Sequence, residues 1–361
     1  GLNNYSTHVV TRKIRNRDQY PFEALTCIKK PSNLIMRKWR KLIYRKLLNR
    51  LMPISKDQAL QMLDIANKLN ADIIHVYMGT EAVQLLPYLR IEKRLKIVSF
   101  HGIDTSGVVS DSDLIAIQMH VDLILVRCQS MKNILVKRGC DPERILLNTT
   151  GVPIQSASIS PKSLEITESN PLRLVQSCRL IEKKGLDISI EVVKKIKDKI
   201  KYVQLDIYGS GPLRDTLLKE VRRSDLETNV VFHGFVENSI LLKELTQFHF
   251  FIHPSRETEK SDREGIPNSI LEAMAIGIPV VTTRHGGIPE AICHKTNGLL
   301  LDTSDASLLS QCILSAIHSN NDYVTMSLSA QATIRDKFSL RQNIEKLETA
   351  YARANFLKNI N

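Results

Sequence analysis

The 361-residue sequence lacks the features that mark membrane-spanning and secreted proteins. Its apolar runs are short and interrupted, well below the roughly 18 residues that a membrane-spanning helix needs. No basic, apolar and cleavage-site pattern of a signal peptide is present at the start. We therefore expect a cytoplasmic protein, and an apolar fraction of 43% is typical of a folded chain long enough for two domains.

Paired cysteines are also absent. The six cysteines are scattered singly, without a C-x-x-C pair or a histidine at metal-ligand spacing. This pattern argues against a disulfide framework and against a structural zinc site. We expect reduced, mostly buried thiols and no bound metal.

Acidic residues are missing between Glu23 and Asp57, whereas residues 29–56 carry ten lysines and arginines. These residues supply most of the net charge of +12, so the remainder of the chain is nearly balanced. A nucleic-acid partner is one interpretation of such a stretch, although the charge is not spread over the chain as a general nucleic-acid surface would require.

The centre of this stretch, residues 35–51, has apolar residues at helical spacing: Ile35, Trp39, Leu42, Ile43, Leu47 and Leu51. Basic residues crowd around them, including Arg37, Lys38, Arg40, Lys41, Arg45 and Lys46. Two interpretations stay open. The helix could pack its apolar side against a domain core, or it could dock on an anionic membrane surface.

What the chain does contain is an alternation of short apolar runs with amphipathic segments. The predicted strands are 72–77, 95–100, 122–126, 172–177, 203–208, 230–232, 248–253 and 279–283. A capping box at Ser55 and Gln58 opens a predicted helix over 55–70. Such alternation predicts an α/β fold with parallel sheets in βαβ units. We expect an N-terminal domain over 1–155, a linker over 156–170, a C-terminal domain over 171–337 and a helix over 338–361 that returns to the first domain.

The most informative stretch is Glu264-Gly-Ile-Pro-Asn-Ser-Ile-Leu-Glu272. Pro267 suits the first turn of a helix, and a glycine-containing turn at a helix N-terminus offers free N–H groups to a diphosphate. Glu264 and Glu272 bracket that position, and carboxylates accept hydrogen bonds from sugar hydroxyls. Taken singly, each glutamate is better explained by a structural role, Glu264 as a first-turn residue that complements the helix dipole and Glu272 as a solvated helix residue.

Two cations follow the predicted strand 172–177. Arg179 and Lys184 stand five residues apart at the carboxyl end of this strand, where open parallel sheets bind ligands. Fixed cations there could neutralise a departing diphosphate without a metal. A solvated basic turn is the alternative.

Together these residues resemble the family 4 glycosyltransferases, over about residues 72–351. The resemblance implies a GT-B fold of two Rossmann-like domains and a retaining, metal-independent and cofactor-free sugar transfer from a nucleotide-sugar donor. It implies that Arg179 and Lys184 bind the diphosphate, that Glu264 acts on the donor sugar and that Glu272 binds the ribose. The backbone N–H groups of Gly265, Ile266 and Asn268 would frame sugar and phosphate.

Four further segments fit the same family. Residues 229–236 look like the base-reading segment, through the backbone at Phe235 and Val236. Residues 100–104 are similar to its HG-x-D segment, with His101 facing the reacting sugar, whereas we treat His75 as structural. Residues 263–267 and 283–290 are most similar to bacterial exopolysaccharide enzymes of the colanic-acid type, which implies a glycan or lipid-linked acceptor. Gly286 and Gly287 could approach a ligand or form a turn.

The family begins with a strand and a glycine-rich loop that this sequence does not show, so we expect a segment to be missing upstream and activity to depend on it. Asp111-Ser-Asp113 has the letters of a metal-binding D-x-D, but we interpret it as a helix cap. A nucleotide-sugar-binding relative without transfer activity, and a nucleic-acid-binding protein, remain the alternative functions.

Overall fold

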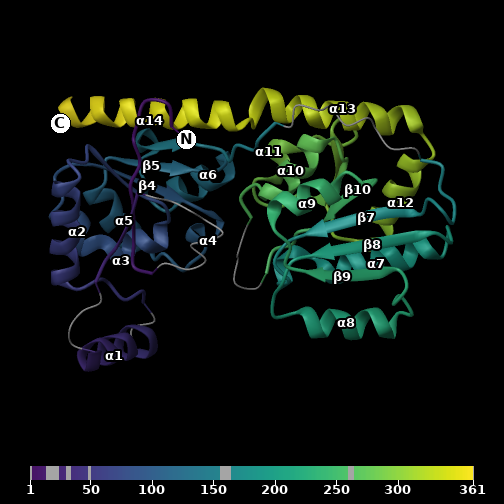
Figure 1. Cartoon of the computed structure of the whole chain (residues 1–361), viewed down its shortest axis with the longest axis horizontal. Coiled ribbons are helices and arrows are strands. Elements are labelled where there is room, and N and C mark those ends of the chain that lie inside the picture. Colours follow the sequence, from purple (N-terminus) through teal and green to yellow (C-terminus); the bar gives the residue numbers. More distant parts are fainter. Residues whose placement is uncertain are drawn as a thin grey trace. The chain divides into compact units, whose positions relative to one another are not determined.

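The computed structural model describes residues 2–13, 24–29, 34–47, 50–154, 164–258 and 264–360. The chain divides into two compact units. Unit 1 comprises Gly1–Asn148 with Ile344–Asn361, and unit 2 comprises Thr149–Asn343. Figure 1 shows the helices and strands of each unit.

The described part of unit 1 contains a parallel sheet in the order β3-β4-β5-β6, with bounds Ile73–Val76, Leu95–Phe100, Leu123–Val126 and Ile145–Leu147. A second, two-stranded parallel sheet pairs β1 (Val9–Thr11) with β2 (Leu25–Cys27). The helices are α1 (Leu34–Leu42), η1 (Ile43–Leu47), α2 (Lys56–Lys68), α3 (Gly79–Leu89), α4 (Gly102–Thr105), α5 (Asp111–His120), α6 (Gln129–Lys137) and η2 (Pro142–Arg144).

The sequence explains these elements. The central strands β4 and β5 are apolar almost throughout and are buried on both faces, as parallel strands between helices should be. The capping box predicted at the start of α2 is confirmed, because Ser55 accepts from Gln58 N and the Gln58 side chain accepts from Ser55 N. The sheet therefore forms where the apolar pattern predicts it.

Helix α14 (Leu340–Ile360) closes the core of unit 1. Its residues Ala350, Tyr351 and Ala354 are buried in one cluster with Leu95 of β4 and Leu123 of β5. His75 in β3 also contacts this helix, because its Nδ1 lies 2.8 Å from the Tyr351 hydroxyl. A segment distant in sequence thus forms part of this core.

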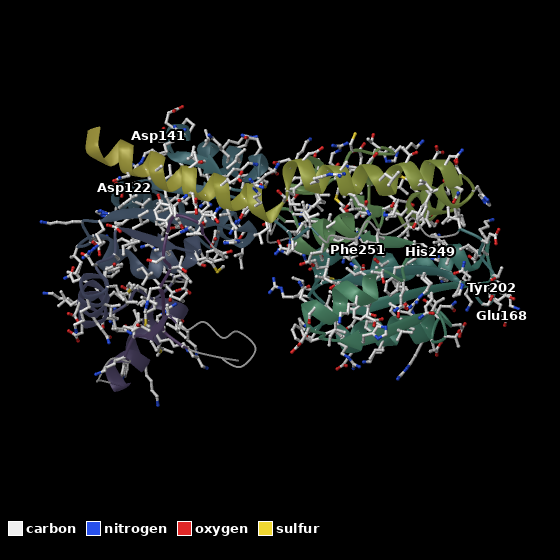
Figure 2. All side chains as sticks on the ribbon, turned by 45° about the horizontal axis from the view of Figure 1, so that its top comes forward. Asp122, Asp141, Glu168, Tyr202, His249 and Phe251 are labelled. Carbon is white, nitrogen blue, oxygen red and sulfur yellow. The ribbon has the colours of Figure 1, made fainter. Side chains whose placement is uncertain are left out.

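The described part of unit 2 holds a six-stranded parallel sheet in the order β12-β11-β10-β7-β8-β9. The strand bounds are β7 (Leu172–Ser177), β8 (Val203–Tyr208), β9 (Val230–Gly234), β10 (Phe250–His253), β11 (Val280–Thr283) and β12 (Gly298–Leu301). The interior of this unit holds the β10 residue Phe251 and the preceding His249, both buried and labelled in Figure 2. These all-parallel sheets confirm the predicted α/β class.

Helices connect and cover these strands: η3 (Glu182–Lys184), α7 (Leu186–Lys197), α8 (Arg214–Arg223), α9 (Asn238–Leu245), α10 (Asn268–Ile276), α11 (Ile288–Ala291), α12 (Ala306–Ile317) and α13 (Asn320–Lys337). The linker expected over 156–170 lies partly outside the described residues. From residue 164 onward it is irregular, and Leu164 and Ile166 pack against the core of unit 2.

Three local expectations need correction. Pro267 is the N-cap of α10 rather than its first helical residue, with an extended backbone (ψ 130°). The cap of α5 is Ser110, whose hydroxyl accepts from Asp113 N, so Asp111 and Asp113 occupy the first turn instead. All six cysteines are free, but Cys27 and Cys293 are exposed, so the thiols are not mostly buried. Within the described ranges, no helix has the length and apolar character to cross a membrane.

Candidate functional site

The candidate site lies at the carboxyl ends of β7 and β10 in unit 2. These two strands pair with each other, and the chain then builds the sheet outward in opposite directions, through β8 and β9 on one side and β11 and β12 on the other. Open parallel sheets bind ligands at such a switch point, outside the carboxyl ends of the strands. Arg179 and Lys184 follow β7, and the segment that contains Glu264 follows β10.

A buried ion pair joins the two segments. Lys184 Nζ lies 2.6 Å from Glu264 Oε1, with the two side chains only 11% and 10% exposed. Lys183, also buried, has its Nζ 3.9 Å from the same oxygen. Arg179 differs, because it is exposed and forms no ion pair with the residues that the structure describes. The structure therefore brings Lys184 and Glu264 together and leaves the Arg179 guanidinium available.

The N-terminus of α10 supplies unused donors. Pro267 has no N–H, and the N–H groups of Gly265, Ile266, Asn268 and Ser269 donate to no residue in the described ranges. Free N–H groups at a helix N-terminus, together with the positive end of the helix dipole, favour an anion. The backbone donors predicted at Gly265, Ile266 and Asn268 are thus present beside Glu264.

A glycine turn fixes the backbone of Glu264. Glu264 N donates to His285 Nε2 at 3.2 Å, and Gly287 N donates to Gly265 O at the same distance. Gly286 between them has φ +56°, and a Cβ there would stand 2.0 Å from the Glu264 carbonyl oxygen. Only glycine fits this position, so the two glycines form a turn that holds the Glu264 loop.

Glu272 lies one turn further along α10 than Asn268. Asn238, the first residue of α9, donates its side-chain N–H to Glu272 Oε1 at 3.3 Å. Burial raises the pKa of Glu272 above its ordinary value, and the bond from Asn238 opposes that rise. The carboxylate is therefore held in place and is easier to protonate than a solvated glutamate.

The comparisons with known proteins agree with this geometry. Residues 161–333 match the family model described as "Glycosyl transferases group 1". The amylovoran biosynthesis glycosyltransferase AmsK of Erwinia amylovora is 31% identical over 288 residues, which are 77% of this chain and 70% of that protein. The chain is a member of the group 1 glycosyltransferases.

Two further similarities add detail to this assignment. A putative colanic acid biosynthesis glycosyltransferase of Escherichia coli, WcaL, is 32% identical over 68% of this chain and 62% of its own length. The crystal structure of Anabaena HepE in complex with UDP and glucose matches with a TM-score of 0.72 at 19% identity, over 91% of this chain and 85% of that one. These matches confirm the GT-B fold of this glycosyltransferase and its predicted similarity to colanic-acid-type enzymes.

The segment expected to read the base, residues 229–236, covers β9 and the first residues of the loop that leads to α9 in this glycosyltransferase. The Phe235 side chain is 69% exposed and Val236 is half-buried. Asn238 follows two residues after Val236, opens α9 and donates to Glu272. The predicted base-reading residues therefore lie two and three residues before the residue that contacts the predicted ribose ligand.

Unit 1 carries the other predicted catalytic residue. His101 follows β4, and its Nε2–H donates to the Tyr77 carbonyl at 2.8 Å. Burial and the nearby Arg127 guanidinium lower the pKa of His101, which favours the neutral form of the ring. Asp104 of the same segment is buried and accepts from the N–H groups of His101, Gly79 and Thr80. Its role is to hold two loops together.

His75 behaves as the sequence predicts for a structural residue. Its Nδ1 contacts Tyr351 and its Nε2 contacts Ser99 Oγ, each at 2.8 Å. Burial, with the Arg127 charge, lowers its pKa from 6.5 to about 4. Both ring nitrogens are therefore committed to the fold.

Sequence reasoning missed three residues of the donor-side site: Lys183, Asn238 and His285. Lys183 adjoins Lys184, and an asparagine that opens a helix beside the base segment was a usable signal. His285 lay in a stretch already noted for its glycines, but nothing in the sequence linked it to Glu264. No group of three metal-ligating side chains occurs among the described residues.

Proposed function

We propose that this glycosyltransferase transfers a hexosyl group from a nucleotide-sugar to a glycan or lipid-linked acceptor in cell-surface polysaccharide biosynthesis. The observation that supports this most is the convergence of Lys184, Glu264 and the free N–H groups of α10 at the β7/β10 switch point. The names of the amylovoran and colanic acid relatives support the polysaccharide pathway.

Each residue has a proposed task. Arg179, Lys184 and the N-terminus of α10 stabilise the negative charge that builds up on the departing nucleoside diphosphate. Lys184 starts from its pair with Glu264, so donor binding exchanges one anionic partner of this lysine for another. Glu264 then accepts hydrogen bonds from the donor sugar, and Glu272 accepts them from the ribose.

Three assignments rest on the family resemblance alone. We propose that His101 faces the reacting sugar, that Phe235 and Val236 read the base through their backbone, and that the anomeric configuration is retained. We also propose that the two cations and the helix N-terminus make a metal unnecessary for leaving-group departure.

We propose further that the enzyme works in the cytoplasm, at the inner face of the membrane, because a lipid-linked acceptor would be presented there. The stretch between Glu23 and Asp57, which contains ten lysines and arginines and no acid, supports this location. A nucleic-acid partner remains an alternative outcome of the same binding tests, and would show affinity that falls steeply with salt.

A panel of UDP-, GDP- and ADP-sugars, scored for binding and for slow donor hydrolysis, tests the proposal. UDP-sugars come first, since the structurally similar HepE was crystallised with UDP. Hydrolysis with NMR detection of the released anomer tests retention, and its persistence in a chelator tests metal independence. A donor that binds but is neither hydrolysed nor transferred would favour the alternative of a binding protein without transfer activity.

A further inference from the structure

The first helix of unit 1 presents an apolar side that the described residues do not cover. Trp39 and Leu42 of α1 and Ile43 of η1 are 63%, 45% and 38% exposed. Their spacing of three and four residues places them on one side of a helix. The core-packed interpretation of this helix is therefore wrong for these three residues, while the side chains of Ile35 and Leu47 lie outside the description.

Uncompensated positive charge surrounds this side. Lys38, Lys41 and Lys46 are exposed, and none of them pairs with an acid in the described ranges. No acid occurs in the sequence between Glu23 and Asp57. An apolar side flanked by lysines, with tryptophan among the apolar residues, is typical of a helix that lies in the interface of an anionic bilayer.

Hydrogen bonds link the segment that carries this helix to the remainder of unit 1. Arg40 donates to the Pro53 carbonyl at 3.3 Å, and Arg50 N donates to the Tyr44 carbonyl at 2.8 Å. The Arg50 side chain also reaches Ser112 Oγ in α5 at 2.6 Å. In Figure 1, α1 projects beyond α2 and α3, away from the sheet of unit 1. Binding of α1 to a surface would therefore also bring unit 1 to that surface.

We propose that the α1 surface, defined as Lys38, Trp39, Lys41, Leu42, Ile43 and Lys46, docks unit 1 on an anionic lipid bilayer. The three apolar side chains enter the boundary between headgroups and acyl chains, and the lysines meet the lipid phosphates. A second copy of the chain is a poorer occupant, because two acid-free surfaces would repel each other. Nucleic acid would use the lysines but leave Leu42 and Ile43 in water. This proposal rests on the membrane location given in the proposed function and names the surface that contacts the lipid. Its test uses no nucleotide-sugar donor.

Trp39 makes the test direct, because it is the only tryptophan in the chain. We expect its emission to shift to shorter wavelength, and its quenching by acrylamide to fall, on addition of phosphatidylcholine vesicles that contain phosphatidylglycerol. Vesicles of phosphatidylcholine alone should give a much smaller change. Raised salt should weaken the binding, since exposed charges are screened.

Matched lysine-to-glutamine variants separate the charge of the α1 surface from the total charge of the chain. Lys38→Gln, Lys41→Gln and Lys46→Gln together should lower vesicle partitioning roughly a hundredfold, at about 1 kcal/mol for each lysine. The control replaces three exposed lysines of unit 2, Lys194, Lys219 and Lys243, with glutamine and removes the same total charge. This control should partition like the wild type.

Leu42→Ala with Ile43→Ala tests the apolar part in the same assay and keeps Trp39 as the probe. Co-sedimentation should weaken while thermal stability stays unchanged, because both side chains are exposed. Absence of binding to anionic vesicles at low salt overturns the proposal. The proposal is also overturned if the unit 2 lysine variant loses as much vesicle binding as the α1 lysine variant. Duplex oligonucleotide binding without vesicle binding would assign the lysines to nucleic acid instead. If no donor were found in the nucleotide-sugar panel, the outcome of these vesicle-binding experiments would not change.

Discussion

Replacing Lys184 with alanine should weaken both the stability of unit 2 and donor binding, whereas Arg179→Ala should weaken donor binding alone. Lys184 forms a buried pair with Glu264, and loss of one partner leaves a charge without compensation. Such losses cost about 3 to 5 kcal/mol. We expect the lower end, about 3 kcal/mol, because Lys183 remains 3.9 Å from the same oxygen. Arg179 is exposed, so its loss should change stability by no more than about 0.5 kcal/mol.

Urea unfolding followed by far-ultraviolet circular dichroism measures the stability difference, and calorimetry with the identified donor measures binding. Both alanine variants should lose about 1.5 to 3 kcal/mol of donor affinity, the range of a charge-assisted hydrogen bond. Adding Glu264→Gln to Lys184→Ala should restore most of the stability, because the carboxylate that Lys184→Ala leaves without its 2.6 Å partner is then gone. If the double variant is no more stable than Lys184→Ala, or if Lys184→Ala is as stable as Arg179→Ala, the ion-pair reasoning is refuted.

Three further predictions concern the remaining site residues. Donor affinity should fall as pH decreases toward the raised pKa of Glu272, because only the ionised carboxylate accepts hydrogen bonds from both ribose hydroxyls. In calorimetry, Glu272→Ala should bind the donor weakly at every pH. Glu264→Gln and His101→Ala should keep most donor affinity but lower kcat, and wild-type turnover in either would contradict its catalytic role. For His75, the pKa of about 4 in the folded state lies below 6.5, so the unfolded state takes up the proton first as pH falls. Unfolding experiments should show stability lost between pH 6.5 and 4, by up to about 3 kcal/mol, and His75→Gln should flatten this dependence.

Strands β3 to β5 and β7 to β11 could be predicted from the sequence because each is a short run rich in apolar and β-branched residues, whereas β1, β2, β6 and β12 were not predicted. The bounds of β4, β7 and β8 agree with the expected ranges to the residue. The start of α10 was wrong by one residue, since proline has the same φ at the N-cap and at the first helical position, and only ψ distinguishes them.

The site could be predicted in part, because Arg179, Lys184, Glu264 and Glu272 stand in a recognisable order along the chain. Their partners could not be predicted. Asn238 and His285 reach the two glutamates across 34 and 21 residues, and such contacts depend on how α9 and the glycine turn pack. The apolar pattern of α1 likewise suited a buried helix and a membrane helix equally, so only the exposure of Trp39 separated the two.

Helix α14 has a consequence for biosynthesis. Unit 1 is completed by Ile344–Asn361, and all of unit 2 is translated between its two parts. A ribosome that has reached Asn148 has therefore not yet supplied Tyr351, the partner of His75, nor Ala350 and Ala354 of the shared core. Unit 2 can therefore fold before unit 1 is complete, and until α14 is synthesised the apolar strands of unit 1 lack part of their buried cluster.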